Sequence, residues 1–114
     1  MIYHMCRREE WGLALQSGTY AGSSRDQADG FIHFSTWEQL PESARKHRKG
    51  QVGLVLLAVD PDVLGNALRW EPSRQGALFP HLYGKFPVSA VRSVFDIPLN
   101  GEGIPTLPLI GKGD

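Results

Sequence analysis

Cysteine is almost absent from this sequence, which has one cysteine, Cys6, among its 114 residues. A single cysteine cannot form an intramolecular disulfide and cannot build a cysteine-rich zinc site. Long apolar runs are missing as well, because no segment approaches the roughly 20 residues that span a bilayer. The first residues are not typical of a signal peptide either. We therefore expect neither secretion nor membrane insertion, and a cytoplasmic protein.

Excess charge of either sign is also missing. Twelve Lys and Arg balance twelve Asp and Glu, so the formal net charge is zero. Proteins that bind nucleic acids or anionic membranes through a general field carry a basic excess. One basic run, ARKHRKG at Ala44 to Gly50, follows Glu38 and Glu42 in a predicted helix, where acid first and base last complement the helix dipole. We therefore expect no nucleic-acid partner.

The pattern of apolar residues predicts a small α+β domain. Strands are predicted at Ile2–Met5, Gly30–Ser35, Gly53–Asp60, Ala67–Pro72 and Leu78–Gly84, with at least one more within Val88–Leu99. Asp60 and Pro61 are typical of the start of a short helical turn. So few helices among the strands favour a mixed, mostly antiparallel sheet with two to three helices. The domain is expected to cover residues 1–99, with a Gly/Pro-rich tail at 100–114.

Helices are predicted in two places. Arg7–Gly18 has helical spacing and ends in glycine. The second helix is expected after Ser35, which forms an S-x-x-E capping box with Glu38, and Pro41 predicts a kink or a new start near its beginning. The segment between, Thr19–Asp29, is polar and without periodicity. It is predicted to be a loop, either a lid over a site or a plain surface connection.

Histidine recurs inside segments that otherwise resemble buried strands. His4 lies in IYHM, His33 in GFIHFS and His81 in FPHLYG. A titratable side chain in such a place is costly unless it is paired. Any one of these histidines fits a hydrogen-bonded interior residue. Three histidines in matching contexts favour a shared functional site about as strongly as they favour three separate, internally hydrogen-bonded histidines.

The two-residue period of strands aligns similar side chains in two of these segments. An aromatic residue, a histidine and a hydroxyl share one face of each: Phe31, His33 and Ser35 in the first, and Phe79, His81 and Tyr83 in the second. If the two strands are neighbours, these stripes form a concave small-molecule site. Its aromatic walls suit a flat ring, and its imidazoles and hydroxyls suit ribose or phosphate oxygens. His4 would supply a third imidazole.

Other chemistries are open at the same place. The three histidines could ligate zinc, but no H-x-H or H-x-x-x-H spacing supports this, so we expect no metal. Cys6 shares a strand face with His4, which makes a Cys–His nucleophilic pair an alternative, although no orienting acid is in view. Trp70 and Glu71 in RWEP would place an aromatic platform and a carboxylate at the cleft. The alternative is that Trp70 lies in the core and Glu71 on the surface.

The segments IYHM, GFIHFSTWEQL, LVLLAVD, LRWEP and FPHLYG, in this order, resemble a bacterial family known as domain of unknown function DUF952. That family is similar to the ADP-ribosyltransferase superfamily, which includes the RNA 2′-phosphotransferases. The more remote similarity lies in Tyr3 and His4 on the first strand, and in a strand that ends in Ser35 and Thr36 and leads into a helix. It implies an ADP-ribosyltransferase-like fold, with NAD as a possible substrate and no certain cofactor.

The resemblance implies roles for individual residues. His4 would hydrogen-bond the nicotinamide ribose, and Ser35 would support the nicotinamide pocket. The catalytic candidates are His4, His33, His81 and Glu71, and the candidates for ligand binding are Ser35, Thr36, Phe31, Phe79, Tyr83 and Trp70. Mono-ADP-ribosyltransferases carry a catalytic glutamate on a late strand. His81 stands in that neighbourhood here, so Glu71 would have to substitute.

The arginines of the RNA phosphotransferases have no clear match, although Arg25 or Arg69 could contribute. We therefore expect an ADP-ribosyltransferase-like enzyme acting on NAD or on an ADP-ribosyl or phosphorylated nucleotide. The missing glutamate leaves a non-catalytic module that binds a nucleotide-like small molecule as an alternative. A structural protein whose histidines are internal ties is a third hypothesis.

Overall fold

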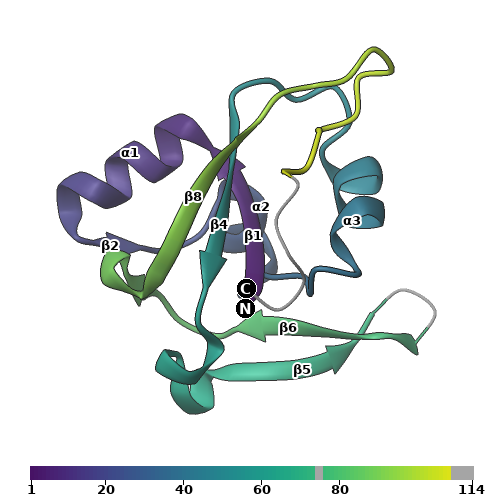
Figure 1. The fold of residues 1–114 in the computed structure, drawn as a ribbon. Coiled ribbons are helices and arrows are strands. Elements are labelled where there is room, and N and C mark those ends of the chain that lie inside the picture. The colour runs from purple at the N-terminus through teal and green to yellow at the C-terminus, as the bar shows by residue number, and fades with distance from the viewer. Residues whose placement is uncertain (74–75, 109–114) are drawn as a thin grey trace.

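The structure of the chain, a computed structural model, describes residues 1–73 and 76–108. Its centre is a three-stranded antiparallel sheet of order β1-β4-β8 (Figure 1), formed by Ile2–Arg7, Leu54–Val59 and Val91–Ile97. Every residue of β4 is buried. This confirms the prediction from its uninterrupted apolar sequence, because β4 lies between two strands and is covered on both faces.

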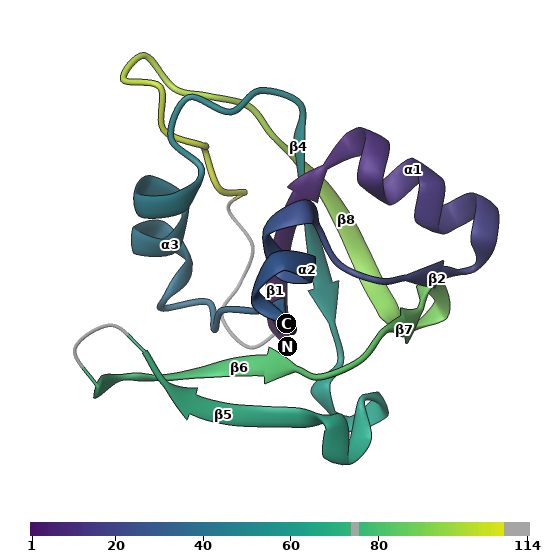
Figure 2. The same ribbon diagram turned by 180° about the vertical axis from the view of Figure 1, so that it is seen from behind.

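Two smaller sheets complete the fold. Their strands are β2 (Thr19–Tyr20) paired with β7 (Phe86–Pro87), and β3 (Ile32–His33), β6 (Leu78–Leu82) and β5 (Leu68–Pro72) in the order β3-β6-β5. The β5–β6 hairpin runs across one end of the central sheet (Figure 2). The α+β class is confirmed, but the single mixed sheet is wrong. All strand pairs within the described residues are antiparallel, and they form three sheets.

The described residues contain three α-helices, α1 (Arg8–Ser17), α2 (Ser24–Asp29) and α3 (Leu40–His47). Short 3₁₀ turns precede the later strands at Pro61–Val63, Gly65–Ala67 and Val88–Ala90. The first of these turns is capped by Asp60, as predicted. None of the helices in the described part of the chain has the length and apolarity to cross a membrane.

The prediction of a loop at Thr19–Asp29 is wrong, because this segment contains β2 and α2. Ser23 caps α2, since its Oγ accepts the backbone N–H of Asp26, and the carboxylate of Asp26 accepts the backbone N–H of Ser23. This is the reciprocal capping box that starts helices. Only Asp26 is buried within α2, so the helix has no apolar periodicity that a sequence pattern could reveal.

The helix predicted directly after Ser35 begins later. Ser35 forms a bridge with Tyr3 of β1 instead, and the two residues exchange backbone hydrogen bonds of 2.8 Å. The reciprocal hydrogen bonds form one position further on, between Thr36 and Gln39, in the turn that precedes α3. Pro41 lies in the first turn of α3, where its missing N–H costs no helical hydrogen bond.

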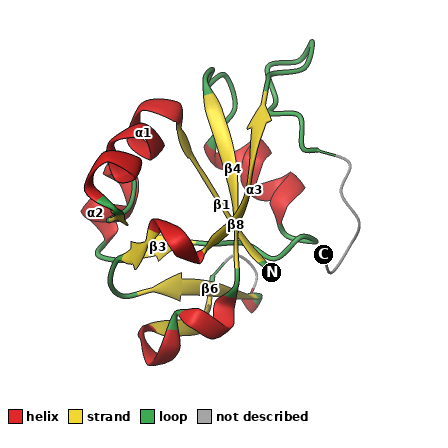
Figure 3. Cartoon of the chain, turned by 60° about the vertical axis from the view of Figure 1, so that its left-hand side comes forward, coloured by secondary structure: helices red, strands yellow, loops and turns green. Residues whose placement is uncertain are grey.

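Two apolar clusters lie on opposite faces of the central sheet. Figure 3 shows α1 and α2 on one side of this sheet and α3 on the other. Alternate residues of β4 serve the two clusters, with Val55, Leu57 and Val59 on the α1 side and Leu54, Leu56 and Ala58 on the α3 side. Leu107, from the predicted tail, packs against the second cluster, whereas residues 109–114 lie outside the described residues.

Candidate functional site

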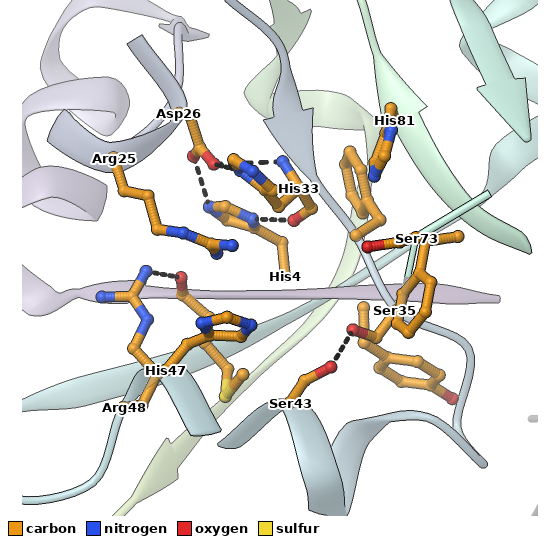
Figure 4. A pocket seen from close by; sticks show the side chains of 14 residues that line it. His4, Arg25, Asp26, His33, Ser35, Ser43, His47, Arg48, Ser73 and His81 are labelled. Atoms are coloured by element: carbon orange, nitrogen blue, oxygen red, sulfur yellow. Dashed lines mark hydrogen bonds and ion pairs between the residues drawn. The ribbon is translucent and has the colours of Figure 1, made fainter. Parts of the chain in front are cut away.

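A cavity of about 130 Å³ lies where β1, β3, β6, α2 and the end of α3 meet. Figure 4 shows the polar side chains that enter it from these elements and from the adjoining segments: His4, Arg25, Asp26, His33, Ser35, Ser43, His47, Arg48, Ser73 and His81. Sites that enclose a drug-sized ligand measure roughly 300 Å³ or more. This cavity therefore suits one phosphate-sized or sugar-sized group rather than a whole dinucleotide.

The two histidine-bearing strands are neighbours, which is the condition that the sequence analysis set for a shared site. β3 pairs with β6 in a register that places His33 opposite His81, with 5.8 Å between the ring centroids. Phe31 stacks on His81 at 4.1 Å between centroids. On the other face of this segment Ile32 and Phe34 are buried in the core, as strand alternation predicted.

Asp26 is the central charged residue of the cavity, and the sequence analysis missed it. Its Oδ1 accepts the backbone N–H of His33 at 3.0 Å and lies 2.5 Å from Nδ1 of the same ring. Its Oδ2 accepts the backbone N–H and the hydroxyl of Ser23, at 2.7 and 2.9 Å. Burial opposes ionisation of this carboxyl, but the hydrogen bonds and the nearby His4 outweigh it and hold its pKa well below the usual range. The S-x-x-D spacing from Ser23 was the signal that could have found it.

His4 lies buried behind this carboxylate. Its Nδ1–H donates to the carbonyl oxygen of His33 at 2.6 Å, and its Nε2 lies 2.6 Å from the hydroxyl of Tyr20 and 3.3 Å from Oδ2 of Asp26. Burial lowers the pKa of His4 despite the attraction of Asp26. Burial also raises the pKa of Tyr20, so its hydroxyl keeps its proton and donates a hydrogen bond to Nε2. The ring of His4 is therefore neutral and fully hydrogen-bonded inside the protein.

His33 is held by carboxylates at both ring nitrogens. Nδ1 lies 2.5 Å from Oδ1 of Asp26, and Nε2 lies 2.9 Å from Oδ2 of Asp29 at the end of α2. The side chain of His33 is 16% exposed and that of Asp29 is 48% exposed. α2 therefore fixes the imidazole from two sides, and the Asp29 contact is the one that solvent or a ligand can reach.

Glu71 is hydrogen-bonded to His81 and does not line the cavity. Its Oε1 accepts the Tyr83 hydroxyl at 2.7 Å and lies 2.8 Å from Nδ1 of His81. The hydrogen bonds from Tyr83 and from His81 lower the pKa of Glu71. A carboxylate that accepts at Nδ1 fixes this nitrogen as the donor. Nε2 of His81 has no hydrogen-bond partner within residues 1–73 and 76–108, and His81 lines the cavity.

Two of the residues predicted to bind a ligand line the cavity, Ser35 and Phe79. Ser35 donates a hydrogen bond of 3.0 Å to the hydroxyl of Ser43 on α3. Arg25, one of the two arginines considered in the sequence analysis, also lines the cavity. Hydroxyl and guanidinium groups therefore lie beside the histidines in the cavity lining.

The other predicted ligand-binding residues lie outside the cavity lining. Phe31 and Tyr83 pack beside the β6 histidine, with 5.3 Å between their ring centroids. Thr36 belongs to the turn before α3. Trp70 is 47% exposed, and strand alternation turns it to the face of β5 opposite Glu71. Arg69 lies over the ring of Tyr83, at 5.2 Å.

The end of the basic run at Ala44 to Gly50 reaches the cavity, which the sequence analysis missed. His47 and Arg48, at the end of α3, both line it. The dipole of α3 explains the position of basic residues in its last turn, but not why Arg48 is buried. The signal in the sequence was present, but charge alone does not tell which face of a helix turns inward.

Neither sequence-based alternative fits this geometry. Cys6 shares a strand face with His4, but it is fully buried, and burial raises the pKa of its thiol to about 12. Such a thiol is not a nucleophile at neutral pH. In the part of the chain that the structure describes, no three His, Cys, Asp or Glu side chains are arranged to hold a metal ion. The three-histidine zinc alternative therefore has no support from the positions of His4, His33 and His81.

The fold and sequence are closely similar to those of protein CC0527 from Caulobacter crescentus. Its crystal structure shares 49% sequence identity with this chain, with a TM-score of 0.90 and 93% of each chain covered. A crystal structure of a double mutant of that protein gives 48% identity and the same TM-score of 0.90. Its solution NMR structure gives 49% identity and a TM-score of 0.81, covering 91% of this chain and 90% of that chain.

No curated protein matches the chain. The family described as protein of unknown function (DUF952) matches residues 5–94. This match confirms the family resemblance drawn from the sequence segments. The names of these relatives carry no activity, so the similarity to the ADP-ribosyltransferases stays a prediction. Because the match covers most of its length, the chain belongs to the DUF952 family.

Proposed function

We propose that the protein is an ADP-ribosyltransferase-like enzyme that acts on NAD, or on another ADP-ribosyl or phosphorylated nucleotide, in this cavity. The observation that carries the proposal is the convergence of His4, His33 and His81, from three different strands, on one cavity. A volume of about 130 Å³ suits one sugar or phosphate portion of such a ligand. The rest of the nucleotide would extend over the rim.

In this proposal His81 is the general base. Glu71 holds its Nδ1–H, which leaves the lone pair of Nε2 to accept a proton. The bond between nicotinamide and the ribose C1′ breaks, and its electron pair leaves with the nicotinamide nitrogen. The acceptor then bonds to C1′ and transfers its proton to Nε2 of His81. Glu71 stabilises the imidazolium that results.

Asp26 and His4 have supporting roles in the same proposal. Asp26 stays ionised because its pKa is held low, so it places a negative charge beside the positive charge that develops on the ribose. His4 has both ring nitrogens engaged within the protein, with His33 and Tyr20. It is therefore a positioning residue that fixes β1 against β3.

Two observations favour a second candidate, a non-catalytic module that binds a nucleotide-like ligand. Both nitrogens of His33 are held by Asp26 and Asp29, so neither is free for proton transfer in this arrangement. Glu71, which would replace the missing catalytic glutamate, does not line the cavity. The two candidates share a ligand and differ in whether a product forms.

Incubation with NAD, followed by chromatography and mass spectrometry of the released nicotinamide and nucleotide products, separates the two candidates. An enzyme releases nicotinamide over time, and His81→Gln and Glu71→Gln lower the rate by roughly 10²-fold or more. Glu9→Gln, which changes an exposed glutamate on α1, is the matched control and keeps the rate.

The same NAD and ADP-ribose samples are followed by NMR of the backbone amides and histidine rings. Saturable shifts at Ser35 and His81 without any product support the binding module. The absence of shifts with both nucleotides contradicts both candidates.

A further inference from the structure

Arg48 is a buried cation whose hydrogen bonds go to neutral groups. The residue is 9% exposed. Its Nη1 donates to Oε1 of Gln51 at 2.9 Å, and its Nη2 donates to the carbonyl oxygen of Met5 at 2.7 Å. Within residues 1–73 and 76–108 it forms no ion pair with a carboxylate. Proteins rarely bury a charge without an opposite charge, because the lost hydration is costly.

Among the described residues, the one carboxylate that lines the cavity is engaged by other groups. Asp26, the carboxylate in the same cavity, is already surrounded by hydrogen bonds from Ser23 and His33. Arg25 enters the cavity from α2 and Arg48 enters from the end of α3, so two guanidinium groups share one small space (Figure 4). A negatively charged group in this space would interact favourably with both guanidinium groups.

The planar guanidinium of Arg48 fixes the directions of its remaining N–H groups. A guanidinium has five N–H groups, and the two hydrogen bonds described above leave three of them for another acceptor. A planar fork of this kind binds carboxylate or phosphate oxygens in pairs. Phosphate presents three terminal oxygens to such a fork, and the cavity volume of about 130 Å³ suits a phosphate-sized group.

We propose that Arg48 anchors an anion subsite that binds a phosphate group of the ligand, with Arg25 and His47 on the walls beside it. This inference rests on the proposed function for the remainder of the ligand, because it assigns the phosphate of that nucleotide to the α3 end of the cavity. The histidines of β3 and β6 then face the sugar that the phosphate carries. Binding of the phosphate would place a negative charge beside Arg48, which has no carboxylate partner within residues 1–73 and 76–108.

The test uses the full chain titrated with inorganic phosphate, against sodium chloride of equal ionic strength. The melting temperature and the amide signals of Ser43 and Gln51 are followed. Phosphate is expected to raise the melting temperature of the unmodified protein and to shift both signals. Arg48→Met, which keeps the aliphatic stem and removes the charge, is expected to lose both effects. Arg45→Met, which removes an exposed arginine of the same helix, keeps them.

Arg48→Lys is the second variant, and it decides the test if Arg48→Met does not fold. It keeps the positive charge and loses the fork, so phosphate binding is expected to weaken by roughly tenfold or more. The inference is overturned if phosphate has no effect on the unmodified protein. It is also overturned if the folded Arg48 variants bind phosphate as tightly as the unmodified chain.

Nucleotide titrations separate the failure of this inference from the failure of the proposed function. ADP-ribose or NAD that binds equally well to the folded Arg48 variants leaves the proposed function standing and overturns the phosphate assignment. Phosphate binding that is lost in these variants, together with no binding of either nucleotide, supports the anion subsite and contradicts the nucleotide function.

Discussion

The three histidines of the cavity do different things, although similar sequence contexts surround them. His4 ties β1 to the backbone of β3 and to Tyr20, so it behaves as the interior residue that the structural hypothesis describes. His33 is held between two carboxylates of α2. His81 keeps one nitrogen without a partner among the described residues. The chemistry of each ring is decided by its partners, and the partners come from segments far away in the sequence.

Replacing His4 with Gln should change how stability depends on pH. Burial lowers the pKa of His4 in the folded chain below its ordinary value of 6.5, so below this pH the unfolded chain binds a proton that the folded chain does not. The free energy of unfolding of the unmodified protein therefore falls as the pH drops below 6.5, by up to about 1.4 kcal/mol per pH unit from this group. His4→Gln lacks this contribution. Urea denaturation between about pH 8 and pH 5 measures the difference.

The contribution of Asp26 to stability falls in a lower pH range. Its pKa is lowered from 3.8, so its stabilisation is complete above that value and is lost as the pH falls further. Measurements above about pH 5 therefore isolate the histidine from this carboxylate. Parallel stability curves for the unmodified protein and His4→Gln would mean that the ring of His4 takes up its proton over the same pH range in the folded and the unfolded chain.

At the scale of elements, strand periodicity predicted the histidine face correctly. A period of two is fixed by the geometry of any strand, so Phe31, His33 and Ser35 were assigned to one face without knowing the fold. The shared site required in addition that the two histidine-bearing strands are neighbours, and β3 does pair with β6. Local geometry is therefore enough to predict which side chains share a face.

The parts of the site that the sequence did not predict depend on contacts between elements. α2 is short and polar, and its only buried residue is a carboxylate, so no apolar pattern marks it. The β5–β6 register places Arg69 opposite His81, so Glu71, two residues further along β5 on the same face, reaches this histidine diagonally. A sequence does not give the register of two strands. Arg48 follows a helix whose inward face is decided by packing.

The entry into α2 gives a prediction about Gly22. Its φ is +102°, and a Cβ there would lie 2.8 Å from Cβ of Asp26 and 3.2 Å from Cγ1 of Ile32. Gly22→Ala therefore combines backbone strain with displacement of the cavity carboxylate. Gly30, at the other end of α2, has φ +88° with nothing within 4 Å of an added Cβ. Gly30→Ala should cost about 1–2 kcal/mol from backbone strain alone.

Gly22→Ala should cost at least about 1 kcal/mol more than Gly30→Ala, because Asp26 cannot keep all its hydrogen bonds when Cβ is pushed away. Denaturant unfolding of both variants checks this. Equal losses in the two variants would show that the chain between β2 and α2 shifts without disturbing the carboxylate. The comparison therefore tests how rigidly α2 holds the cavity.

At the scale of the whole molecule, the cavity belongs to no single sheet. Its lining comes from β1, β3, β6, α2 and α3, which lie between Tyr3 and His81 in the sequence. Such a site exists only when the central sheet and the β5–β6 hairpin are both in place. A ligand that binds there binds the folded chain alone and therefore stabilises the whole fold in proportion to its occupancy.

Cys6 should report the opening of the whole molecule. It is the chain's one cysteine, it is fully buried in β1 beside the central strand, and burial raises its pKa to about 12. A thiol reagent should therefore modify the native protein about 10³-fold or more slowly than the chain in denaturant. Absorbance after addition of a disulfide reagent measures both rates. We expect exposure of Cys6 to require opening of the whole molecule, because β4 cannot stay covered when β1 leaves it. Rapid labelling of the native chain would mean instead that β1 separates from β4 locally.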